Sequence, residues 1–134
     1  MLRRILAVAT GIVVAMAVVV AVEALGSLVF RPPPGMDPTN ADSVRANMPN
    51  VAVGALLVVL LAWALGGLAG SYVVARLVSA REALLGFIVG GFVLAGGLAA
   101  LLQYSHPVWF IVAGPLAVIG ATVLGVRLGS ARTA

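Results

Sequence analysis

The stretch AVEALGSLVFRPPPG, residues 21–35, decides the fold because an arginine and three prolines end a long apolar run here. The run extends from Ile5 to Phe30, and at about 1.5 Å per residue its helix is roughly 39 Å long. This exceeds the ~30 Å hydrocarbon core of a bilayer, so we expect a spanning helix that tilts or enters the headgroups. Glu23 is the only carboxylate within this run.

The composition is that of a membrane protein, with 63% hydrophobic and 9% charged residues among 134. Soluble domains carry about 25% charged residues. The chain lacks cysteine and lysine, which excludes disulfides, thiolate metal sites, Schiff-base catalysis and a Walker-type phosphate loop. One histidine and four acids make a metal site a poor expectation, and no cofactor is predicted.

Four apolar runs predict an all-α bundle of four transmembrane helices in one integral membrane domain, residues 1–134. The expected helices cover about residues 5–30, 51–75, 83–102 and 108–126. The first run is longer than the ~7–15 residues of a signal-peptide core, which favours an uncleaved signal-anchor helix over a cleaved signal.

Arginines predict the orientation. One side of the membrane would hold both termini and the second connection, with six arginines, and the other side would hold only Arg31 and Arg45. This bias places the N- and C-termini in the cytoplasm and makes two in-out-in hairpins. The same placement explains the net charge of +4 without a nucleic-acid partner. ARLVSAR at residues 75–81 and VRLGSAR at 126–132 indicate either hairpin duplication or common helix-end composition.

The first connection, residues 31–50, is the one sizeable outer loop. Thr39 and Asp42 have capping-box-like spacing, and Ala41, Val44 and Met48 follow at helical spacing. We expect a short amphipathic helix on the outer membrane surface, ended by Pro49. Asn50 would then cap the second spanning helix.

Small residues at four-residue spacing predict close helix packing, within a compact bundle or between subunits. The expected helix-packing positions are Gly11, Gly66, Gly70, Gly86, Gly90, Ala121 and Gly125. Gly114-Pro115 predicts a kink in the fourth helix.

Glu23 heads the candidate polar or ligand site. Arg31 lies roughly 12 Å further along the helix, and the Glu23 side chain leans the other way, so we expect a partner from another helix. Gln103, Tyr104 and His106 are expected at the same edge, and Ser27 shares the face of Glu23. We predict that Glu23 bonds one of these groups or water.

Three functions compete. Binding, as a scaffold, an accessory subunit of a membrane complex or a lipid-binding module, is the first interpretation. The second is a proton- or cation-coupled transporter using Glu23, although the long outer loop and missing aromatic site depart from the small multidrug exporters. The third, a Ser105–His106–Glu23 hydrolase, lacks a nucleophile elbow, so no enzyme activity is predicted. Membrane lipid and a homo-oligomer or larger complex are the expected partners.

The patterns VEALGSLVFRPPPGMDP at residues 22–38, LLAWALGG at 60–67 and HPVWF at 106–110 resemble small uncharacterised four-helix membrane proteins of bacteria. The resemblance implies the topology and a location in the bacterial inner membrane. It implies no catalytic residue.

Overall fold

The computed structural model describes residues 1–131, which form helices and no β-strand within that range. Four long helices make up a bundle: α1 Leu2–Val29, α3 Val53–Leu77, α4 Gly86–Gln103 and α5 Val108–Ser130. Each lies in a segment long and apolar enough to cross a membrane, with the 3₁₀ helix η2, Ala80–Leu85, leading into α4. The predicted all-α bundle of four apolar helices is therefore confirmed.

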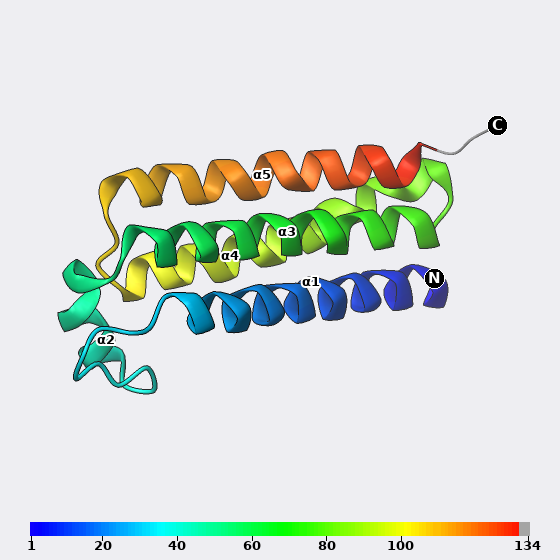
Figure 1. Cartoon of the computed structure of the whole chain (residues 1–134). Coiled ribbons are helices and arrows are strands. Elements are labelled where there is room, and N and C mark those ends of the chain that lie inside the picture. Colours follow the sequence, from blue (N-terminus) through cyan, green and yellow to red (C-terminus); the bar gives the residue numbers. More distant parts are fainter. Residues whose placement is uncertain (132–134) are drawn as a thin grey trace.

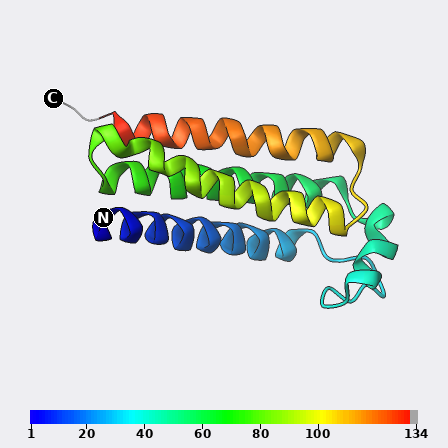
Figure 2. The same ribbon diagram turned by 180° about the vertical axis from the view of Figure 1, so that it is seen from behind.

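Successive long helices run in opposite directions (Figure 1). One end of the bundle holds Met1, η2 and the last turn of α5, and we call it the terminal end. The opposite end, the loop end, holds residues 30–52 and 104–107 (Figure 2). Helix α3 is central because it packs against α1, α4 and α5.

Small residues let α1 and α3 approach backbone to backbone. A Cβ atom added to Gly70 would lie 2.6 Å from the Gly11 carbonyl oxygen, and one added to Gly66 would lie 3.0 Å from that of Ala15. Such approach replaces the hydrophobic driving force that is absent between helices in lipid. The other predicted packing positions are Gly86 against Ser71, Gly90 against Thr122, Gly125 against the Leu68 backbone, and half-buried Ala121.

Two helices are longer than the apolar runs predict. Helix α1 begins at Leu2 instead of residue 5, and α5 continues to Ser130 instead of ending at residue 126. The helical hydrogen-bond ladder does not stop where apolarity stops, so the arginines beside these runs become part of the helices. Arg132 lies outside the described residues.

The loop end carries a short helix, α2 Ala41–Asn47, followed by the 3₁₀ helix η1, Met48–Asn50. Its N-cap is Asn40, whose Oδ1 accepts hydrogen bonds from the backbone N–H groups of Asp42 at 3.0 Å and Ser43 at 3.2 Å. The predicted cap, Thr39, instead donates to Asp37 from its backbone and its hydroxyl. The capping prediction was therefore wrong by one residue.

Helix α2 contacts the bundle through half-buried Val44, and the following Met48 is buried. The prediction that Asn50 caps α3 was wrong. Asn50 belongs to η1, and the N-cap of α3 is Ala52, which makes no side-chain cap bond. Helix α5 runs through Pro115 as one continuous element.

Two arginines bind the carboxyl ends of helices across the bundle. The Nε and Nη2 atoms of Arg3 donate to the Leu77 carbonyl oxygen at 3.1 and 2.9 Å. Arg45 donates in the same forked way to the Gln103 carbonyl oxygen, at 3.1 and 2.9 Å. A cation at a helix C-terminus satisfies an orphan carbonyl and opposes the helix dipole. Each arginine thus ties one end of the bundle together.

Candidate functional site

A groove opens between α1, α3 and α4 in the half of the bundle nearest the loop end. Its volume is about 410 Å³. The polar or partly polar side chains that line it are Glu23, Trp63, Tyr104 and His106. The remaining wall is apolar or glycine and comes from Met16, Val19, Val59, Phe92, Val93, Gly96 and Ala100.

Glu23 lies on α1 with its side chain exposed to this groove. The Trp63 indole of α3 lines the same groove and is the side chain that interacts with the Glu23 carboxyl. An indole N–H is a donor only, so its role toward a carboxylate oxygen is that of a donor. Within residues 1–131 the ion pairs are Arg4–Glu82 and Arg45–Asp42, so Arg31 forms none with Glu23.

Two glycines make room for the Trp63 ring. A Cβ atom at Gly97 of α4 would lie 3.0 Å from the indole, and one at Gly114 of α5 would lie 3.4 Å from it. The indole also meets Phe110 edge to face, with ring centroids 5.4 Å apart. Trp63 is therefore fixed on its buried edge by packing, and its N–H is directed to the groove side.

His106 is held in a defined orientation at the loop end. Its ring stacks on Phe110 with centroids 4.8 Å apart and planes 14° apart. Its Nδ1 lies 3.1 Å from the Tyr104 carbonyl oxygen. A carbonyl only accepts, so Nδ1 must carry the proton and Nε2 is the acceptor of the neutral ring. This hydrogen bond joins the His106 ring to the Tyr104 backbone and not to the neighbouring Ser105.

The structure brings three of the five predicted site residues to one groove: Glu23, Tyr104 and His106. The side chain that interacts with Glu23 is nevertheless Trp63, and not one of the groups from the 103–106 turn. The position of Trp63 near the middle of its helix was a usable signal, because a buried indole N–H requires a partner.

The other two predicted residues lie elsewhere. The Ser27 hydroxyl donates to the Ala24 carbonyl oxygen at 2.7 Å, and Ser27 lines a smaller groove of about 200 Å³ between α1 and α3, on the other side of Glu23. The backbone carbonyl of Gln103 accepts hydrogen bonds from Arg45 at the loop end. Neither side chain reaches the larger groove.

Within the described residues no group of three or more His, Asp or Glu side chains is placed to hold a metal ion. What the groove offers is one carboxyl group, one indole donor, an imidazole and a phenol beside a long apolar wall. This arrangement suits an amphipathic molecule with a small polar head.

The fold and the groove define the class as a membrane protein with four helices able to span a bilayer. Comparisons with protein-family models, curated proteins and solved structures found no match, so the groove itself carries the functional argument.

Proposed function

We propose that this small multi-pass membrane protein acts by binding, and that its ligand is an amine-bearing membrane lipid held in the groove between α1, α3 and α4. The carrying observation is the placement of Glu23 and Trp63 at the polar part of an otherwise apolar groove. Its volume of about 410 Å³ falls within the ~300–1,000 Å³ range of ligand sites. A protonated amine donates several hydrogen bonds, which a carboxylate accepts.

The depth of Glu23 fits this ligand. Helix α1 has 28 residues and is roughly 42 Å long, about 12 Å more than the ~30 Å hydrocarbon core. If both ends share the excess, each extends by about 6 Å. Glu23 is six residues from Val29, or about 9 Å along the axis, so it sits only about 3 Å inside the hydrocarbon. A lipid headgroup reaches this level.

The proposal includes the orientation of the bundle in the membrane. The terminal end carries Arg3, Arg4, Arg76, Arg81 and Arg127, so it faces the cytoplasm of a bacterial cell, across the inner membrane. The groove then opens to the outer leaflet. Helix α2, with Val44 toward the bundle, lies on the outer surface and is followed by the buried Met48 of η1.

The test is a thermal-unfolding measurement on the purified chain in neutral detergent, with phosphatidylethanolamine or phosphatidylcholine added. A ligand that binds only the folded state raises its stability, about 2.7 kcal/mol at 100 times the Kd. We expect phosphatidylethanolamine to raise the Tm more than phosphatidylcholine, whose head donates no N–H. Glu23→Gln should remove that difference, and Ser27→Ala, one turn away, should keep it.

A second readout uses Trp63 directly. The chain has two tryptophans, so in a Trp109→Phe background the emission reports Trp63 alone. The amine lipid should shift this emission in the parent and not in the Glu23→Gln variant. An identical lipid response with and without the carboxylate would refute the proposal. Glu23-dependent proton or cation flux in proteoliposomes would instead favour the transporter.

A further inference from the structure

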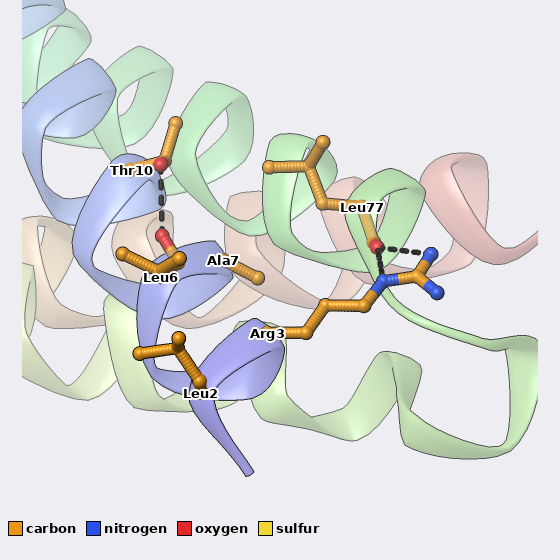
Figure 3. Close-up of a pocket in the computed structure, with 6 residues that line it drawn as sticks. All are labelled: Leu2, Arg3, Leu6, Ala7, Thr10 and Leu77. Atoms are coloured by element: carbon orange, nitrogen blue, oxygen red, sulfur yellow. Dashed lines mark hydrogen bonds between the residues drawn. The ribbon is translucent and has the colours of Figure 1, made fainter.

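A second groove lies at the terminal end, on the opposite half of α1. It has a volume of about 430 Å³ and is lined by Leu2, Arg3, Leu6, Ala7, Thr10 and Leu77. Figure 3 shows Arg3 reaching across from α1 to the Leu77 carbonyl of α3. The groove therefore has a cation at its end, and apolar side chains dominate the rest of its wall.

The Arg3 guanidinium is held in a fixed orientation but keeps N–H donors that have no acceptor within residues 1–131. A guanidinium has five N–H groups in a planar fork. The Arg3 hydrogen bonds go from Nε and Nη2 to one acceptor, the Leu77 carbonyl oxygen. This contact fixes the plane of the fork, and the other N–H groups are left for an oxyanion. By contrast, Arg4 is paired with the Glu82 carboxylate.

The charge around this groove has one sign. Within residues 1–131 the terminal end holds five arginines and one acid, Glu82. The loop end holds two arginines, Arg31 and Arg45, and two acids, Asp37 and Asp42, so its charges balance without Glu23. An anion is therefore attracted to the terminal end and not to the loop end.

The groove also has the polarity gradient of a lipid. From Arg3 to Thr10 it follows α1 for seven residues, about 10 Å, from the helix end toward the bundle centre. The Thr10 hydroxyl donates to the Leu6 carbonyl oxygen at 2.8 Å, so it presents no free donor to the groove. A phosphate at Arg3 would place an acyl chain along Leu6, Ala7 and Thr10.

From these features we infer that the groove at Arg3 is a binding site for an anionic phospholipid of the leaflet at the terminal end. The phosphate of the lipid accepts hydrogen bonds from Arg3 N–H groups, and one acyl chain lies against Leu6 and Leu77. This site differs from the groove at Glu23 in its end of the bundle, in the sign of its charge and in its headgroup.

Native mass spectrometry of the full chain, after exposure to phosphatidylglycerol and phosphatidylcholine in equal amounts, tests the inference. A hydrogen bond from a guanidinium to a phosphate contributes about 1.5 kcal/mol or more, or about tenfold in affinity. Arg3→Gln should therefore lower the phosphatidylglycerol preference about tenfold. Arg127→Gln removes the same charge at the same end from α5, outside the groove, and should leave the preference unchanged.

Leu6→Trp separates lipid binding from the loss of the Arg3–Leu77 contact. It keeps the arginine and fills the groove at a side chain that is 56% exposed, so the fold should tolerate it. We expect it to bind one phosphatidylglycerol fewer than the parent. Equal losses in Arg3→Gln and Arg127→Gln would mean general charge attraction only. That result, or parental binding by Leu6→Trp, overturns the inference.

Discussion

The terminal half and the loop half of the bundle hold three helices together by different means. In the terminal half, Gly11 and Gly70 bring α1 and α3 into backbone contact, and Val89 of α4 fills the space beside them. In the loop half, the large ring of Trp63 stands between the helices, and a groove remains between α1 and α4. The small residues close the contact between α1 and α3, which we call the seam. The Trp63 ring instead keeps α1 and α4 apart and leaves room for a ligand.

The largest expected effect comes from breaking the closed seam with Gly70→Val. The added side chain meets the Gly11 carbonyl oxygen and Val89, and such overpacking costs about 3 kcal/mol. Gly91→Val is the matched control, because a Cβ atom there has no neighbour within 4 Å. Equilibrium unfolding in mixed micelles, followed by circular dichroism, measures both variants. Equal losses would mean that the seam is no tighter than the lipid-facing surface.

A smaller effect is expected from removing the tie at the loop end with Arg45→Gln. A cation at a helix C-terminus is worth about 0.3–1 kcal/mol, so the last turn of α4 should open more often. Hydrogen exchange at the Gln103 and Tyr104 amides should become faster, with little change at the centre of α4. Arg31→Gln is the control at the same end, since Arg31 has no hydrogen-bond partner within residues 1–131. Faster exchange in both variants would contradict a specific cap.

The smallest effect concerns pH and is confined to the loop end. The Thr39 hydroxyl and backbone N–H hold the pKa of the exposed Asp37 carboxyl below its ordinary value of 3.8. A lowered folded pKa means that the turn is stabilised above about pH 3.8 and loses this contribution as the pH falls through the lowered value. A carboxyl-carbon NMR titration should show the depressed pKa. Thr39→Val keeps only the backbone donor, so its Asp37 pKa should lie between the two values. No upward movement would exclude the hydroxyl as a cause.

The sequence predicted the spanning helices well because the bilayer sets their length and apolarity, and composition alone reveals both. It also placed Glu23, Tyr104 and His106 near one edge, since helix direction alternates along the chain. It did not predict Trp63 as the partner of Glu23. That contact depends on how α1 and α3 rotate about their axes, and the small-residue seam determines the rotation.

The arginines show the same limit. Their positions at helix ends are evident in the sequence, but a charge does not reveal which carbonyl it will bind. Arg3 and Arg45 therefore counted only as markers of orientation, whereas each binds a helix end across the bundle. Likewise, Gly97 and Gly114 make room for a single indole, and no spacing rule connects them with Trp63.

The contacts of the first turn of α1 have a consequence for biogenesis. Arg3 binds a carbonyl 74 residues later, and Arg4 pairs with a carboxylate 78 residues later. At about 5–20 residues per second, a ribosome needs roughly 4–15 s to make the intervening chain. During that interval the first helix has no partner for its leading arginines. Maturation at this end therefore waits for the turn at η2, and the leading arginines of α1 are secured only after that turn has been made.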